Sequence, residues 1–140
     1  MREPAAMTKA IQQSVRFSAP PEELFEIYMD SKKHSEAAGG AAKLSRKVGG
    51  KFTAWDGQLK GQNLQIVPNQ LIVQSWRASH WKPTDADSIL ILRFSAVPGG
   101  GRVDLVHENV PAHDHKGVSQ GWKTYYWQPW RKYLAKKEQG

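Results

Sequence analysis

Six short segments between residues 43 and 110 are typical of β-strands, and the connections between them are too short for a crossover helix. The segments comprise residues 43–48, 51–55, 59–67, 71–79, 88–97 and 102–110. Turn-forming pairs such as Gly49-Gly50, Asp56-Gly57 and Pro68-Asn69 separate several of them. Because neighbouring parallel strands need a connection of about a dozen residues or more, these short connections favour an antiparallel meander.

One strand and two short helices are predicted before this meander. Residues 11–17 alternate between apolar and polar side chains, which predicts a half-buried strand. Pro20-Pro21 followed by Glu22-Glu23 favours a helix start, because proline suits the first turn and acidic side chains complement the helix dipole. Asp30 or Ser31 is then suited to cap a second short helix.

Residues 112–137 return to the helical period and predict one long closing helix. On a helical wheel the following side chains form one wide stripe: Val118, Trp122, Tyr125, Tyr126, Pro129, Trp130 and Tyr133. Pro129 lacks an N–H and its ring crowds the preceding turn, so a kink is expected there. The order of elements indicates an α+β layer architecture, in which a curved sheet buries its concave face against this helix.

The length of 140 residues suffices for one domain with its own core. We expect a flexible N-terminal arm at residues 1–10 and a single domain over residues 11–137; Met1 and Met7 are both possible starts of translation. The absence of cysteine excludes disulfides, thiolate metal sites and thiol catalysis. No apolar run approaches the ~20 residues of a membrane helix and no secretion signal opens the chain, so a cytoplasmic protein without membrane contact is expected.

The basic character of the chain concentrates in two segments, residues 43–51 and residues 116–137. Lysine and arginine number 20 against 13 acidic residues, which gives a net charge of +7 at pH 7. Nucleic-acid-binding domains combine such charge with exposed aromatic side chains, whereas most aromatic side chains here lie on the predicted buried stripe. We therefore expect a solvated basic exterior, with an acidic protein surface as the alternative partner and no nucleic acid.

Several short motifs resemble sites of chemistry but lack the context that the chemistry requires. The segment Gly117-Val118-Ser119-Gln120-Gly121 matches the G-x-S-x-G elbow, yet it lies in the predicted helix and the chain is too short for that enzyme fold. We interpret its two glycines as allowing the helix to approach a neighbour closely. His113-Asp114-His115 has no further convergent ligands, so neither a metal site nor a cofactor is predicted.

Glycines, aromatics and apolar residues recur in a specific order from Ile11 to Leu134. That order comprises Phe17–Phe25, Val48–Phe52, Asp56-Gly57, Gly61, Ile66–Pro68, Leu71–Arg77, a strand ending at His107, Gln120–Trp122 and Tyr125-Tyr126. It resembles the activator of heat-shock protein 90 ATPase homologue 1-like family, within the START-like, polyketide-cyclase-like helix-grip superfamily. The resemblance implies a helix-grip fold: a curved antiparallel sheet of about six or seven strands wrapped on a long C-terminal helix, with short helices after the first strand and an apolar pocket inside.

Four functional hypotheses follow, the last of which is nucleic-acid binding, disfavoured by the predicted burial of most aromatic side chains. In the first, a non-catalytic domain binds an unidentified apolar small molecule in a pocket lined by Phe25, Tyr28, Trp76, His107, Trp122 and Tyr126. In the second, a co-chaperone-like domain stimulates a heat-shock protein 90 type ATPase and meets its acidic surface through Lys123, Trp127, Arg131 and Leu134. Trp127 suits this exposed contact or, if the Pro129 kink turns it, a packed position. In the third, a cyclase- or hydrolase-like enzyme uses His107, which equally suits a hydrogen-bonded core position.

Overall fold

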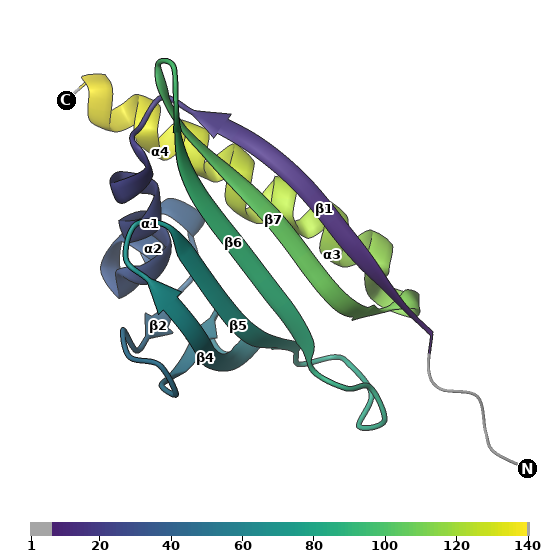
Figure 1. Cartoon of the computed structure of the whole chain (residues 1–140). Coiled ribbons are helices and arrows are strands. Elements are labelled where there is room, and N and C mark those ends of the chain that lie inside the picture. The colour runs from purple at the N-terminus through teal and green to yellow at the C-terminus, as the bar shows by residue number, and fades with distance from the viewer. Residues whose placement is uncertain (1–6, 140) are drawn as a thin grey trace, which may run out of the picture.

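Seven strands form one antiparallel sheet in the computed structural model, which describes residues 7–139 (Figure 1). They are β1 (Thr8–Phe17), β2 (Lys43–Leu44), β3 (Lys51–Ala54), β4 (Leu59–Val67), β5 (Leu71–Ala78), β6 (Ser88–Val97) and β7 (Gly100–Pro111). Their order across the sheet is β1-β7-β6-β5-β4-β3-β2. The first strand is therefore an edge strand, which pairs with the last strand of the meander. Residues 1–6, with Met1 and most of the predicted arm, lie outside the described residues, and β1 takes in residues 8–10.

Two short helices follow β1, as the sequence predicts. Helix α1 (Pro21–Met29) starts after Pro20 and carries its two glutamates in the first turn. Helix α2 (Ser31–Ala38) is capped by Asp30, whose carboxylate accepts a hydrogen bond from the backbone N–H of Lys33 at 2.9 Å. It ends at Gly39, which adopts a left-handed conformation that glycine reaches without a steric penalty.

The C-terminal helical segment contains an irregularity. A 3₁₀ turn η1 (Ala112–Asp114) leads into α3 (His115–Trp122), a π turn η2 (Lys123–Trp127) and α4 (Gln128–Gln139). In the π turn the N–H of Gln128 donates to the carbonyl of Lys123, five residues back. The predicted kink at Pro129 therefore takes the form of a wider turn just before the proline, which has no N–H for the carbonyl of Tyr125.

A side chain from β1 compensates for this irregularity. The N–H of Lys123 donates to the carbonyl of Gln120 rather than to that of Ser119. The side-chain amide of Gln13 donates to the carbonyl of Ser119 at 2.9 Å, and its oxygen accepts a hydrogen bond from Nε1 of Trp127 at 2.7 Å. Gln13 thus ties the edge strand to the helix on both sides of the change in winding.

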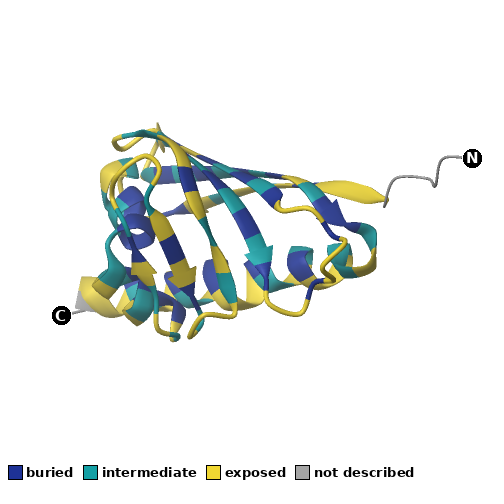
Figure 2. Ribbon diagram, turned by 90° about the horizontal axis from the view of Figure 1, so that it is seen from below, coloured by how far each residue is buried: buried dark blue, intermediate teal, exposed yellow. Residues whose placement is uncertain are grey.

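The concave face of the sheet carries the core. Strand β5, and β7 as far as His107, alternate between buried and half-buried residues, as the banding of the strands in Figure 2 illustrates. Ile72, Val103 and Leu105 are fully buried. From the helix, Trp130 is fully buried against this face. The α+β helix-grip architecture predicted from the sequence is confirmed.

The strand predicted at residues 43–48 is shorter than expected, because Asn63 on β4 holds most of it as a loop. Its side-chain amide donates to the carbonyls of Ser45 and Lys47 at 2.8 and 3.0 Å. Its backbone also exchanges hydrogen bonds with Gly49 and Gly50. β2 therefore ends at Leu44.

Candidate functional site

An open cleft of about 530 Å³ lies between the sheet and the first half of the C-terminal helical segment. Its sheet side comes from the β3–β4 turn, β4, β5 and the β5–β6 loop, and its helix side from η1, α3 and η2. The residues that line it are Trp55, Gln58, Leu59, Trp76, Ala78, His80, Asp114, Gly117, Val118, Gly121, Trp122, Tyr125 and Tyr126. A cleft of this volume is in the range occupied by small-molecule ligands.

Two glycines make the helix wall of the cleft shallow. A Cβ added to Gly117 would meet only Asp114, at 2.7 Å from Oδ1, and one added to Gly121 only Tyr125, at 3.7 Å. Both neighbours belong to the same helical segment, so among residues 7–139 no other element comes within 4 Å of a Cβ at either position. The interpretation that these glycines allow close helix packing is therefore wrong. The missing side chain of Gly121 leaves space in the cleft, and that of Gly117 makes room for the carboxylate of Asp114.

Aromatic rings form the floor and one end of the cleft. Trp122 lies 6.2 Å from Trp76 and 4.7 Å from Tyr126, measured between ring centroids. At the open end Trp55 meets Tyr125 edge-on at 5.2 Å, and Tyr125 is 53% exposed. Trp55 has a φ of 51°, a left-handed conformation that is rare for a bulky residue and that marks a constrained position.

The other end of the cleft is polar. Oδ2 of Asp114 accepts hydrogen bonds from Nε1 of Trp81 at 2.7 Å and from Nε2 of His80 at 2.8 Å. Trp81 in turn packs on Trp76 with 5.5 Å between the ring centroids. Asp114 therefore joins the β5–β6 loop to the start of α3, beside the cleft floor.

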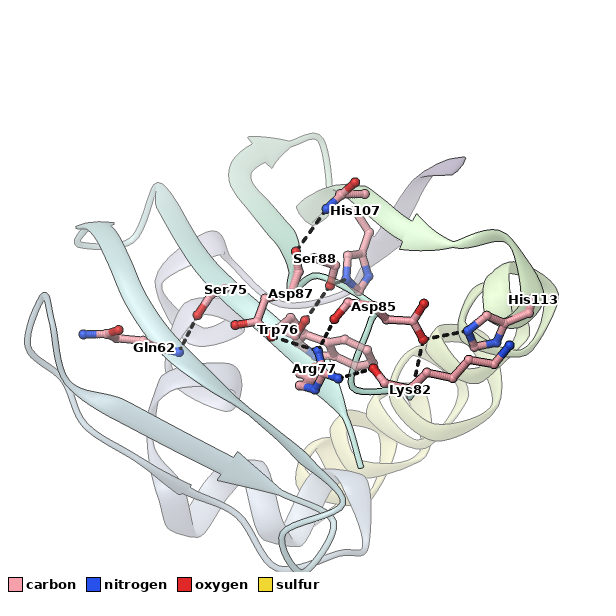
Figure 3. A network of polar contacts seen from close by, with 11 residues as sticks. Gln62, Ser75, Trp76, Arg77, Lys82, Asp85, Asp87, Ser88, His107 and His113 are labelled. Carbon is pink, nitrogen blue, oxygen red and sulfur yellow. Dashed lines mark hydrogen bonds and ion pairs between the residues drawn. The ribbon is translucent and has the colours of Figure 1, made fainter. Parts of the chain in front are cut away.

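The β5–β6 loop is held in place by further polar contacts (Figure 3). The guanidinium of Arg77 donates to the carbonyls of Asp85 and Lys82 at 2.6 and 2.5 Å. The carboxylate of Asp85 accepts from Nε2 of His113 at 2.8 Å. This hydrogen bond, more than the backbone N–H of Lys82, holds the pKa of Asp85 below its usual value.

His107 is a hydrogen-bonded core histidine. Its Nδ1 accepts from Nε1 of Trp122 at 3.1 Å, which assigns the proton to Nε2. Nε2 donates to Oγ of Ser88 at 2.7 Å (Figure 3). Ser88 then donates to the carbonyl of Trp76 at 2.7 Å. Burial lowers the pKa of His107 to about 3, and both ring nitrogens are occupied, so neither is free for a substrate.

Tyr28 also lies in the packed interior rather than in the cleft. Its hydroxyl donates to Oε1 of Gln74 at 2.7 Å, and the amide of Gln74 donates to Asn63 at 2.9 Å. Burial raises the pKa of Tyr28 well above its ordinary value.

Tyr126 connects the cleft to a second buried histidine. Its hydroxyl donates to Nε2 of His34 at 3.0 Å, since Nδ1 of His34 donates to the carbonyl of Tyr28 at 2.7 Å. Burial lowers the pKa of His34 to about 4 and raises that of Tyr126. Tyr126 is therefore held in one orientation at the cleft floor.

Three of the six predicted ligand-binding residues line the cleft: Trp76, Trp122 and Tyr126. Phe25, Tyr28 and His107 do not, because the interior next to them is filled. Phe25 packs edge-on against Phe94 at 5.6 Å, and the other two are hydrogen-bonded as described above.

Several cleft residues were missed from the sequence: Trp55, His80, Asp114, Gly117, Gly121 and Tyr125. The available signal was the positions 114, 117, 121 and 125, whose spacing of three or four residues places them along one helix face. That face joins an acid, two glycines and an aromatic, which is unusual for a packed surface.

The predicted partner-binding residues divide into two pairs. Trp127 is only 4% exposed and stacks on Trp122 at 5.6 Å, and Leu134 is also buried. Of the two alternatives for Trp127, the packed position is confirmed and the exposed contact is wrong. The partner-binding role predicted for Leu134 needs an exposed side chain, which it does not have; the π turn rotates both residues toward the sheet. Lys123 and Arg131 remain on the surface, and the guanidinium of Arg131 lies 5.0 Å from the centre of the Phe17 ring.

Within residues 7–139, no three His, Cys, Asp or Glu side chains are grouped as they would be to hold a metal ion. No helix in that part of the chain is long and apolar enough to cross a membrane.

Comparison with known proteins gives a consistent result. The profile of the family described as "Activator of Hsp90 ATPase homolog 1-like protein" matches residues 18–135. The human activator of 90 kDa heat shock protein ATPase homolog 1 is 29% identical over 112 residues, which are 80% of this chain and 33% of that protein. The Dictyostelium discoideum homolog is 25% identical over 118 residues, or 83% of this chain and 30% of that protein. The chain thus spans about a third of the length of these relatives.

Solved structures share the fold. An HSP90 activator from Plasmodium falciparum superposes with a TM-score of 0.82 at 24% identity, over 90% of this chain and 96% of that one. A Mesorhizobium loti protein superposes with a TM-score of 0.78 at 19% identity, over 91% and 98%. Since the family profile covers most of the chain, the protein belongs to the activator of Hsp90 ATPase homolog 1-like family.

Proposed function

We propose that this chain is a non-catalytic helix-grip domain that binds an apolar small molecule in the cleft beside α3. The observation that carries the proposal is the combination of an aromatic floor with a helix wall on which Gly117 and Gly121 carry no side chain. Aromatic rings offer a large contact area at a small cost in conformational entropy, and the cleft is open to solvent at the end near Tyr125. The cytoplasmic location expected from the sequence is part of this proposal.

The alternative of an enzyme that uses His107 receives less support. A general acid or base needs a nitrogen within reach of the substrate and a pKa near the working pH. Both nitrogens of His107 are engaged, and its pKa of about 3 keeps the ring neutral.

Titration with a panel of lipophiles tests ligand binding. Tryptophan fluorescence and the melting temperature are the two readouts. A ligand that binds the folded state raises the melting temperature, and one that contacts Trp76 or Trp122 changes the fluorescence. The variant Gly121→Leu should fill the cleft and abolish both signals. Gln120→Leu adds a leucine at the neighbouring exposed position and should preserve them. The proposal fails if no lipophile affects the unmodified protein, or if Gly121→Leu binds as tightly as Gln120→Leu.

A second candidate function is contact with a heat-shock ATPase of the kind that the relatives are named for. The observation that favours it is the row of exposed basic side chains on the helical segment, namely Lys123, Arg131, Lys132, Lys136 and Lys137. Such a row attracts an acidic surface in a salt-dependent manner.

The test is retention of the host chaperone on the immobilised domain at low and moderate salt, together with the chaperone's ATPase rate. The double variant Lys123→Glu with Lys132→Glu should lose retention, while Gly121→Leu should keep it. Absence of retention and an unchanged ATPase rate would reject this candidate.

A further inference from the structure

The charge of the cleft is opposite to the charge of the protein as a whole. The chain carries a net charge of +7, yet none of the described residues that line the cleft is a lysine or an arginine. The lining contains one carboxylate, that of Asp114, and one histidine, His80, which is bonded to it. A ligand in the cleft therefore meets a locally acidic end within a basic protein.

One oxygen of that carboxylate is available to a ligand. Oδ2 of Asp114 already accepts from Trp81 and His80, and the side chain makes no capping bond to α3. Oδ1 has no hydrogen-bond partner among the described residues, and it lies 2.7 Å from the position that a Cβ on Gly117 would take. Because Gly117 lines the cleft, this oxygen lies beside space that a ligand's donor group can occupy.

The remainder of the cleft fits an elongated apolar body. Asp114 and Tyr125 are eleven residues apart on one helical segment, which corresponds to roughly 16 Å at 1.5 Å per residue. Between them lie Gly117, Val118 and Gly121, and the rings of Trp76 from β5 and Trp122 from α3 form the floor. The acidic group is thus at one end of an apolar trough, and the aromatic pair of Trp55 and Tyr125 is at the other.

We propose that the cleft selects cationic amphiphiles, with a primary ammonium group on Oδ1 of Asp114 and an apolar chain along Gly117 and Gly121. This inference rests on the proposed ligand-binding function and specifies its ligand class. An ammonium group donates charge-assisted hydrogen bonds to a carboxylate, whereas a hydroxyl donates a neutral one and a carboxylate is repelled.

The test compares octylamine, octanol and octanoate at pH 7, three probes with the same chain and different head groups. Their dissociation constants are measured by calorimetry and by tryptophan fluorescence. A charge-assisted hydrogen bond exceeds a neutral one by about a factor of ten in affinity, so octylamine should bind about tenfold more tightly than octanol, with octanoate weakest. Asp114→Asn should reduce octylamine binding to the level of octanol and leave octanol unchanged.

Two further variants keep the result interpretable. Asp87→Asn removes a nearby carboxylate that does not line the cleft, and it should preserve the preference for the amine. Gly117→Ala keeps the charge of Asp114 but places a methyl group beside Oδ1, so it should also remove the preference for the amine. This variant provides the test if Asp114→Asn folds poorly. Equal binding of octylamine and octanol, or tighter binding of octanoate, overturns the inference while ligand binding stands. Failure of all three probes to bind refutes the ligand-binding function together with the inference.

Discussion

Replacement of Trp127 by alanine tests whether this residue belongs to the core. The ring is 4% exposed, stacks on Trp122 at 5.6 Å and meets Trp130 edge-on at 5.3 Å. Truncation of a buried aromatic residue to alanine costs about 3–5 kcal/mol through lost burial and the remaining cavity. The lost hydrogen bond to Gln13 adds about 1 kcal/mol, part of which overlaps with the cavity term.

We therefore expect Trp127→Ala to lower the free energy of unfolding by about 4 kcal/mol, a large fraction of the 5–15 kcal/mol typical of a domain. For a chain of this length the melting temperature should fall by roughly 12–20 °C. Urea unfolding followed by circular dichroism at 222 nm measures the change without relying on tryptophan fluorescence.

The matched control is Tyr125→Ala, two residues earlier in the same turn. Tyr125 is 53% exposed, so its loss should cost less than about 1 kcal/mol. A cost for Trp127→Ala below about 1.5 kcal/mol, or one equal to that of Tyr125→Ala, would refute the assignment of Trp127 to the core.

Three further predictions concern pH, the helix and a loop. Burial lowers the pKa values of His107 and His34 from 6.5 to about 3 and about 4. Below about pH 6.5 these two histidines therefore bind protons in the unfolded chain but not in the folded one. The free energy of unfolding should therefore fall as pH decreases from about 6.5 to 4, and His107→Gln should flatten that curve. Gln13→Ala leaves the carbonyl of Ser119 and Nε1 of Trp127 without partners and should cost about 2 kcal/mol in urea unfolding. Asn63→Ala removes the contacts that hold residues 45–50, so amide exchange there should accelerate, whereas exchange in β7 should not change.

The sequence was sufficient to predict the sheet, because short connections and residue alternation depend on local chemistry. It was equally sufficient for the cap at Asp30 and for the start of α1. A helical wheel assumes about 100° per residue throughout, so it placed Tyr125 on the buried stripe, which is wrong, and left Trp127 open between an exposed and a packed position. On that wheel Trp127 is about 140° from Trp122, but the extra residue of a π turn brings it back to within about 40°. Tyr125 is correspondingly turned out to the surface.

The candidate site was predicted only in part. Trp76, Trp122 and Tyr126 were identified because large aromatics on facing elements mark the helix–sheet interface. The position of the cleft along that interface was not predictable, because it depends on which parts are filled. The interior is filled around Phe25, Tyr28 and His107, because these residues form ring contacts and hydrogen bonds with segments distant in the sequence.

The single extra residue in η2 has consequences in two places at once. The same rotation that brings Trp127 into the core moves Tyr125 to the rim of the cleft, where it meets Trp55. Deletion of one residue from this turn would restore regular winding, withdraw the ring from the rim and break the connection through Gln13. The packing of the core and the shape of the cleft therefore both depend on the length of this turn. Sequences that differ in length here should differ in what they bind, even where the sheet is identical.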